Sequence, residues 1–232
     1  MAFRYNVSSY DELKQIIVAD VVLILAFSLT VSGGIFGLGS RSSFVSNFLL
    51  FIPIAALAVT LSFVLHELMH KFAAQHYGAI AGFRTSPTGL MITLVTGAMG
   101  FLLGIPGATM IYASHFTKRE NGIVSLAGPL TNFVVFIVFV SLFYMYNPAA
   151  GSYLYTTLTF TIFVSILLAF FNMLPIPPLD GSKVLAWSKP IYFAVLAVVF
   201  VLMILYTAIP ISSIIFMLII ALFFSLFYRL VL

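Results

Sequence analysis

The sequence has no cysteine and very little charge. The absence of cysteine excludes disulfide bonds, thiolate metal ligands and a cysteine nucleophile. Charged residues make up only 7% of the 232 residues, whereas hydrophobic residues make up 62% and the mean hydropathy is +1.19. A soluble domain of this size does not need so much apolar surface, but a protein embedded in a bilayer does. The composition therefore predicts a single polytopic unit with the lipid bilayer as its main surroundings.

The few basic residues exceed the acidic ones, which gives a net charge of +4 and a pI of about 9.4. They stand at the ends of apolar tracts and in short connections instead of forming a cluster. This placement is typical of residues that set membrane orientation, and it does not favour binding to nucleic acid.

Long apolar tracts cover most of the chain and predict about six transmembrane helices. The six tracts are Ile16–Ser32, Phe48–Tyr77, Val124–Tyr146, Tyr153–Phe171, Ile191–Ile209 and Ile211–Tyr228.

A further apolar tract, Leu90–Tyr112, is interrupted by four glycines and a proline. If this tract does not cross the membrane, nine of the ten basic residues lie on one side and only Arg41 lies on the other. If the tract does cross, the ten basic residues divide into four on one side of the membrane and six on the other. Because basic residues collect on the cytosolic side, we expect a re-entrant or β-hairpin element there, with both termini and the basic side in the cytosol.

Two histidines and a glutamate stand together in the sequence His66-Glu67-Leu68-Met69-His70, directly after an apolar run. Ionisable groups at membrane depth are costly and usually functional. Histidines at i and i+4 share one helix face, and the glutamate between them is the usual general base of a zinc hydrolase. A solvated surface is the ordinary alternative for such a pattern, but a span this apolar does not favour it.

A third metal ligand is predicted at Asp180. The 18 residues before His66 rise about 27 Å as a helix, close to the thickness of the hydrocarbon core, so the histidines lie near the cytosolic edge. The span that begins at Tyr153 runs in the same direction and ends in the prolines at 175, 177 and 178, where we expect the chain to leave the helix. The extended segment then offers Asp180, with Gly181 permitting a tight turn. Asp180 as a plain turn residue is the alternative.

These patterns, HExxH, Gly128–Asn132 (GPLTN) and NxxPxxxLDG from Asn172 to Gly181, resemble the site-2 protease family of intramembrane zinc metalloproteases. The resemblance covers residues 48–181, the three-helix catalytic core of that family. It implies one zinc ion held by His66, His70 and Asp180, and Glu67 as catalytic base. It also implies that Asn132 and Asn172 are polar residues of the substrate cleft, and that the enzyme cuts transmembrane protein substrates within or near the membrane.

The expected fold is therefore an all-α polytopic membrane protein with a three-helix catalytic core and a small re-entrant or β-hairpin element. Residues 1–47 form an N-terminal interfacial helix and first span, residues 48–189 the catalytic core, and residues 190–232 two C-terminal spans. The sequence does not set the oligomeric state.

Several alternatives stay open. A divalent-metal transporter would also place histidines and acids inside its spans. Asn132 could hydrogen-bond between helices, and Asn172 could cap a helix. We expect Gly128-Pro129 to open a helix, because proline suits a first turn. His76 stands at the spacing of a third zinc-binding histidine, but Ala73 replaces the glycine that such a motif needs, so an interfacial role is favoured.

Overall fold

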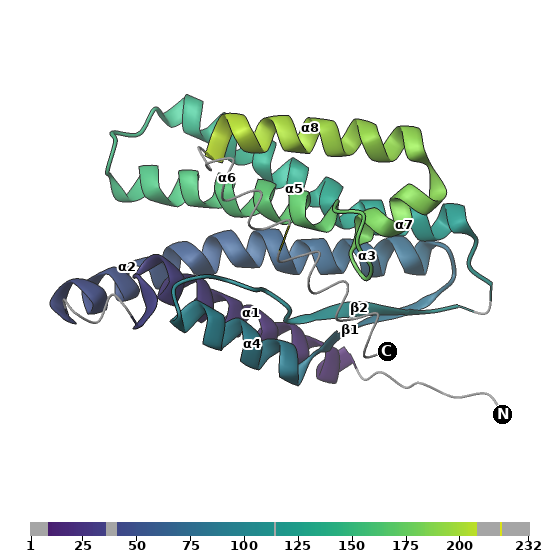
Figure 1. The fold of residues 1–232 in the computed structure, drawn as a ribbon, viewed down its shortest axis with the longest axis horizontal. Coiled ribbons are helices and arrows are strands. Elements are labelled where there is room, and N and C mark those ends of the chain that lie inside the picture. Colours follow the sequence, from purple (N-terminus) through teal and green to yellow (C-terminus); the bar gives the residue numbers. More distant parts are fainter. Residues whose placement is uncertain (1–8, 36–40, 114, 208–218, 220–232) are drawn as a thin grey trace.

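The computed structural model describes residues 9–35, 41–113, 115–207 and 219 (Figure 1). Helices dominate it, together with one π-helical turn (η2) and two strands. In chain order the elements are α1 (Ser9–Val31), α2 (Arg41–Val59), η2 (Thr60–Val64), α3 (Leu65–His76), β1 (Ile80–Thr85), α4 (Pro87–Ala98), β2 (Gly107–Tyr112), α5 (Lys118–Tyr146), α6 (Tyr153–Asn172), α7 (Asp180–Trp187) and α8 (Lys189–Thr207).

The long helix formed by α2, η2 and α3 lies in the middle of the molecule (Figure 1). It packs against α5 and α6 on one side, and against α1 and the two strands on the other. α8 covers α6, and α7 packs against α5 and α8. The helix that carries the HExxH sequence is therefore enclosed by both layers, which restricts access to its side chains.

Five helices within the described residues are long and apolar enough to cross a membrane. They cover Asp11–Val31, Ser43–His76, Lys118–Tyr146, Tyr153–Asn172 and Lys189–Thr207. They match the first five predicted spans, and the sixth, Ile211–Tyr228, lies outside the described residues apart from Ile219. The chain is thus a multi-pass, predominantly helical membrane protein, as its composition predicts.

The tract Leu90–Tyr112 forms no spanning helix. It begins inside α4, a helix of only 12 residues, and ends with β2, which pairs antiparallel with β1, with Phe83 opposite Thr109. The connection back from α4 is irregular, and the hydroxyls of Thr93 and Thr96 accept hydrogen bonds from the amides of Ile105 and Leu103, at 3.0 and 3.1 Å. Protein hydroxyls thereby satisfy part of this irregular backbone, which is what such a segment requires if it lies at membrane depth. The prediction of a small β element is confirmed, although its first strand begins ten residues before the predicted tract.

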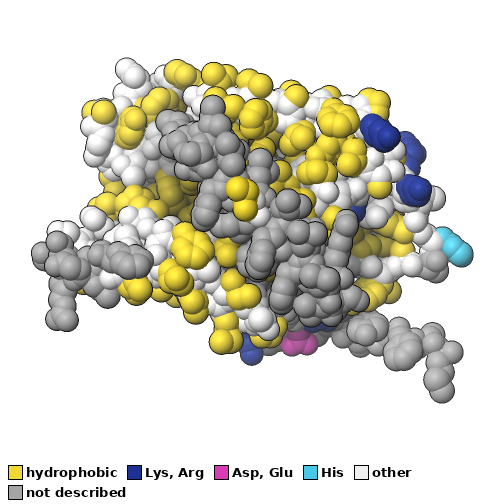
Figure 2. Space-filling model, in the orientation of Figure 1, with side chains coloured by type: hydrophobic (Ala, Val, Ile, Leu, Met, Phe, Trp, Pro, Cys, Tyr) yellow, Lys and Arg dark blue, Asp and Glu magenta, His cyan; other side chains and the backbone are white. Residues whose placement is uncertain are grey.

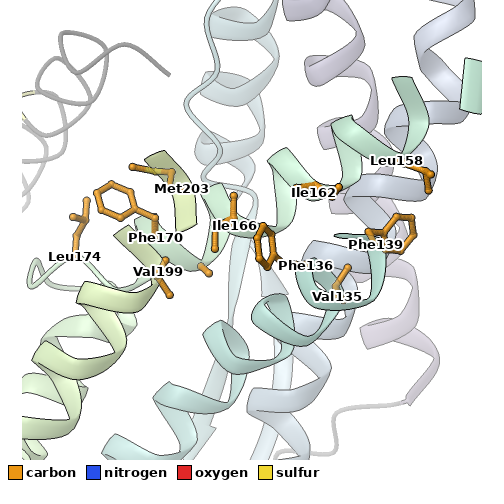
Figure 3. Packing of buried hydrophobic residues seen from close by; sticks show 11 residues of the cluster. Val135, Phe136, Phe139, Leu158, Ile162, Ile166, Phe170, Leu174, Val199 and Met203 are labelled. Carbon is orange, nitrogen blue, oxygen red and sulfur yellow. The ribbon is translucent and has the colours of Figure 1, made fainter. Parts of the chain in front are cut away.

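The largest hydrophobic core lies between α5, α6 and α8 (Figure 3). It contains Val135, Phe136, Phe139, Leu158, Ile162, Ile166, Ala169, Phe170, Leu174, Val199 and Met203. Lipid tails are as apolar as these side chains, so close packing holds the helices together more than exclusion from water does. A second cluster joins α1 to the central helix and includes Phe63 and Phe83, whose rings meet edge to face.

The outer surface is mostly apolar, with many hydrophobic side chains spread over the helices (Figure 2). Lysine and arginine side chains gather in this view at the end of the molecule where α7 and the start of α8 lie. An apolar belt with charge at its ends suits a protein surrounded by lipid.

Candidate metal centre

The central helix places both histidines and Glu67 inside the protein. His66, Glu67 and His70 are 2%, 9% and 6% exposed. The two imidazoles lie on the same face because they are one helical turn apart, and their Nε2 atoms are 3.0 Å from each other. The helix continues through Ala73 to its last residue, His76, which is exposed and stands apart from this pair.

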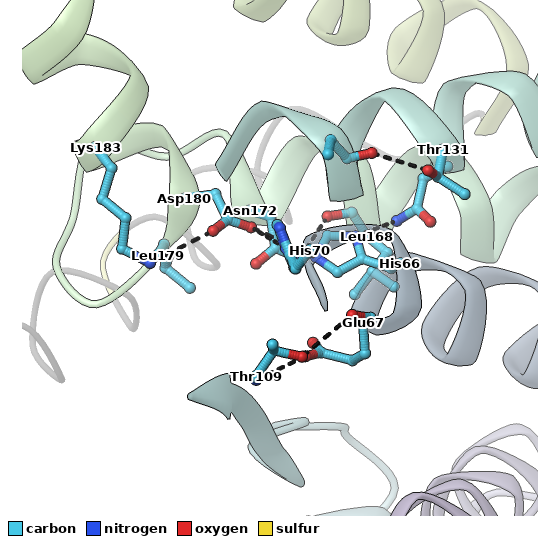
Figure 4. A network of polar contacts seen from close by, with 12 residues as sticks. His66, Glu67, His70, Thr109, Thr131, Leu168, Asn172, Leu179, Asp180 and Lys183 are labelled. Atoms are coloured by element: carbon cyan, nitrogen blue, oxygen red, sulfur yellow. Dashed lines mark hydrogen bonds and ion pairs between the residues drawn. The ribbon is translucent and has the colours of Figure 1, made fainter. Parts of the chain in front are cut away.

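Asp180 reaches the same point from the other end of the catalytic core (Figure 4). Its Oδ2 lies 3.4 Å from Nε2 of His66 and 3.0 Å from Nε2 of His70. The expectation of an extended segment was wrong at this residue, because Asp180 is the first residue of α7. Seven residues, 173–179, separate the end of α6 at Asn172 from the start of α7.

Glycine is required at position 181 because there is no room for a side chain, and not because of its backbone conformation. A Cβ at this position would collide with the carbonyl oxygens of Met173 and Leu174. The start of α7 therefore packs directly on the backbone that follows α6, and this contact sets where Asp180 lies.

Two nitrogens and a carboxylate oxygen, all within 4.8 Å of one another, form a donor set that suits zinc. Ligand atoms around a tetrahedral zinc ion at its usual bond lengths are about 3.3 Å apart, close to the three separations found here. Among the described residues this is the single group of three histidine or acidic side chains with such spacing. The fit holds for the geometry and for the chemistry of the donors.

Charge at the centre favours an ionised carboxylate. Burial raises the pKa of the Asp180 carboxyl, but the facing imidazoles of His70 and His66 outweigh it and hold the pKa well below its usual range. Lys183, one turn along α7, lies 3.6 Å from the other carboxylate oxygen. Asp180 can thus act as an anionic ligand.

Helix α5 supplies the outer partners of both imidazoles. Nδ1 of His70 lies 2.8 Å from the carbonyl oxygen of Val124, so Nδ1 carries a proton, and Nε2 is the nitrogen that would bind a metal once it has lost its own proton. Nδ1 of His66 lies 3.2 Å from Nδ2 of Asn132. Because a metal-bound His66 would also carry its proton on Nδ1, it needs an acceptor there. The side-chain oxygen of Asn132, buried without a partner among the described residues, becomes that acceptor when the amide rotates by half a turn.

Gly128 lets α5 approach this closely. A Cβ there would collide with the rings of both His66 and His70. The expectation that Gly128-Pro129 opens a helix was wrong, because α5 begins at Lys118, where Thr117 and Glu120 form a capping box. Proline is tolerated inside membrane helices more readily than inside soluble ones.

The two asparagines lie in different surroundings. Asn132 is completely buried against His66, whereas Asn172 is partly exposed and donates to the carbonyl of Leu168 in its own helix, at 3.0 Å. Their role as residues of the substrate cleft stays a prediction.

The side chain of Glu67 points toward Thr109 of β2 (Figure 4). Its Oε2 accepts hydrogen bonds from the hydroxyl and the backbone amide of Thr109, at 2.8 and 2.9 Å. Sequence reasoning missed Thr109, and it also missed the carbonyl of Val124, since neither residue stands in a recognisable pattern. Gly128 was part of a quoted motif, but the clash that it prevents is visible only in three dimensions.

Comparison with known proteins agrees with this geometry. The family model of peptidase family M50 matches residues 140–188. The protein named "Putative zinc metalloprotease MJ0611" from Methanocaldococcus jannaschii is 43% identical over 147 residues, which are 63% of this chain and 75% of that protein. Two proteins with the same description, Rip2 from Mycolicibacterium smegmatis and YwhC from Bacillus subtilis, are 28% and 29% identical and have 70% and 68% of their length covered.

No solved structure matches the chain significantly. The similarity to MJ0611 is nevertheless high and covers most of that protein, and the matched M50 segment contains Asp180. The chain therefore belongs to peptidase family M50, the site-2 protease family, and is a zinc metallopeptidase of the membrane.

Proposed function

We propose that this chain is an intramembrane protease that hydrolyses peptide bonds of transmembrane protein substrates within or near the membrane. One observation carries the proposal: His66, Glu67 and His70 lie on a helix long and apolar enough to cross the bilayer, and Asp180 of α7 meets the two histidines there. An ordinary soluble zinc peptidase has no reason to bury its ligands in such a helix.

The position of the site along the central helix supports cleavage near one membrane surface. The candidate span Ser43–His76 has 34 residues, and His66 and His70 lie in its last third. Met69 and Phe72, on other faces of the same helix, are 40% and 54% exposed and offer apolar surface to lipid. A substrate bond would thus be cut close to the boundary between lipid and water, where water can enter.

The residues of the site divide the chemistry between them. A zinc ion held by His66, His70 and Asp180 would lower the pKa of a bound water toward about 7 and polarise the peptide carbonyl. Glu67 would take a proton from the attacking water as general base while the water oxygen adds to the peptide carbonyl, and would return that proton to the amine nitrogen as the C–N bond breaks. Val124 and Asn132 keep the two imidazoles oriented through their Nδ1 atoms.

A substrate helix must unwind before its backbone can be attacked, because its carbonyls are hydrogen-bonded. Pairing with a strand edge would hold the unwound segment. The outer edge of β1 is covered, because Glu12 and Gln15 of α1 accept hydrogen bonds from the amides of Phe83 and Thr85. The outer edge of β2 faces α3, so a substrate strand paired there would lie beside Glu67 and compete with it for the Thr109 amide.

The distribution of basic residues supports an active site on the cytosolic side. Lys71, Lys118 and Lys183 all stand near the metal-site ends of their helices, as the positive-inside rule expects for cytosolic ends. We therefore include a cytosol-facing active site in the proposal.

The test uses purified protein reconstituted in liposomes with a model substrate that has a single transmembrane helix. The parent protein should cleave it, and Glu67→Gln should keep its zinc while losing activity by about a hundredfold or more, because it lacks a general base. Cleavage by the Gln variant at the parent rate would remove Glu67 from the mechanism.

A metal transporter is the competing function, and the same liposomes test it. Loaded with a zinc-sensitive dye, they should show no more zinc uptake than empty liposomes. Zinc uptake by the parent protein without any cleavage would establish transport instead of proteolysis.

A further inference from the structure

The side chain of Glu67 is long, and catalysis requires its carboxylate to stay in one place. Glutamate has three rotatable side-chain bonds, and a general base must lie within hydrogen-bonding distance of the proton that it removes. The helix fixes only the backbone of Glu67. Its carboxylate must therefore be held by a group from another element.

Thr109 is that group among the described residues. Its hydroxyl lies 2.8 Å from Oε2 of Glu67 and 3.1 Å from the Glu67 carbonyl oxygen, and its amide lies 2.9 Å from Oε2. Both donors contact the same carboxylate oxygen, so Thr109 restrains the group without using Oε1. The exposed fraction of Glu67 is only 9%, so these bonds form largely out of water and are stronger for it.

Thr109 is itself held in place by the sheet. It stands in β2 opposite Phe83 of β1, and the amide of Phe83 donates to Glu12 of α1 at 3.1 Å. The hydroxyl of Thr109 therefore projects from a strand that is fixed on its other side by a helix. Residues that position catalytic groups work best when their own place is fixed in this way.

We propose that Thr109 is a positioning residue for the general base, and that its hydroxyl holds the Glu67 carboxylate in the orientation needed for proton transfer. This inference rests on the proposed proteolytic function. It assigns a catalytic purpose to the small sheet in addition to substrate pairing.

The experiment compares Thr109→Val, which keeps the shape and β-branching of the side chain, with Thr109→Ser, which keeps the hydroxyl. Loss of one hydrogen bond to a charged group should lower kcat of Thr109→Val about tenfold or more, with KM and zinc content unchanged. Thr109→Ser should stay within about threefold of the parent. Thr157→Val is the matched control, because that hydroxyl bonds only to the backbone of its own helix.

A Thr109→Val protein with parental kcat would overturn the inference, and so would a change confined to KM, which would indicate contact with substrate. The contact itself is tested without substrate by hydrogen exchange at the Thr109 amide. Exchange should be faster in Glu67→Ala, which has no acceptor, than in Glu67→Gln, which keeps one. Equal rates would refute the contact. Failure of the parent to cleave any substrate would instead refute the proposed function.

Discussion

At the scale of single residues, the orientation of the two imidazole rings depends on contacts with α5. Val124 contributes a carbonyl and Asn132 an amide, while Gly128 between them contributes only empty space. A histidine presents its Nε2 lone pair reliably when its other nitrogen has a fixed partner. About two turns of α5 thus orient both histidines for the metal.

Asn132 gives the sharpest test of this arrangement. Asn132→Leu removes the partner of His66 and should weaken zinc affinity about 10- to 100-fold, the usual effect of losing an outer partner. Asn132→Asp keeps an acceptor and should bind zinc close to parental strength. Competition with a chromophoric chelator measures both affinities. If Asn132→Leu holds zinc as tightly as the parent, Asn132 does not orient His66.

The ligand residues could be predicted from the sequence, whereas their partners could not. His66, Glu67 and His70 stand within five consecutive positions, and Asp180 follows a proline-rich break. Thr109 and Val124 reach the site only through tertiary packing, and nothing in their neighbouring residues distinguishes them from other strand or helix residues.

At the scale of elements, the sequence signals for where a helix begins gave wrong predictions in two places. Proline at 129 was expected to start a helix, yet α5 runs from Lys118 to Tyr146 through it. The capping box that begins the helix, Thr117 with Glu120, starts twelve residues before Pro129 in a polar segment. At the other end of the core, α7 has only eight residues, too few for a periodic pattern to predict.

Glu12 joins three elements. Its side chain, 7% exposed, lies 2.6 Å from Nζ of Lys71 on α3 and accepts a hydrogen bond from the Phe83 amide of β1. Removing a buried charged partner leaves the other groups unpaired.

Glu12→Ala should therefore lower the free energy of unfolding by about 2 kcal/mol, a reduced figure because Lys71 is 21% exposed. Thermal unfolding in detergent measures the effect. Asp11→Ala, an exposed acid at the neighbouring position, should change little. Equal stability of the two variants would mean that Glu12 does not hold α1 to the catalytic helix.

At the scale of the whole molecule, five of the six predicted spans and the non-spanning tract followed from hydropathy and from the distribution of basic residues. These two signals work because lipid imposes length and charge constraints on every helix. The packing of the layers could not be predicted, since it depends on shape complementarity between apolar surfaces that look alike in sequence.

Orientation can be measured directly, because the chain has no cysteine of its own. Gln75→Cys lies at the metal-site end of the central helix, and Ala150→Cys lies in the connection between α5 and α6; both positions are exposed. A membrane-impermeant maleimide added to intact cells should label Ala150→Cys and leave Gln75→Cys unlabelled until the membrane is opened. The reverse pattern would place the active site outside the cytosol.

The donors at the metal centre come from segments separated by more than a hundred residues, and this has a mechanical consequence. A bound ion cross-links two segments and closes a long loop of the catalytic core. Its removal therefore increases the conformational entropy that the chain loses on folding. Treatment with a chelator should therefore lower the melting temperature as well as stop proteolysis, and added zinc should restore both. A melting temperature indifferent to chelation would mean that the protein scaffold alone ties α7 to the central helix.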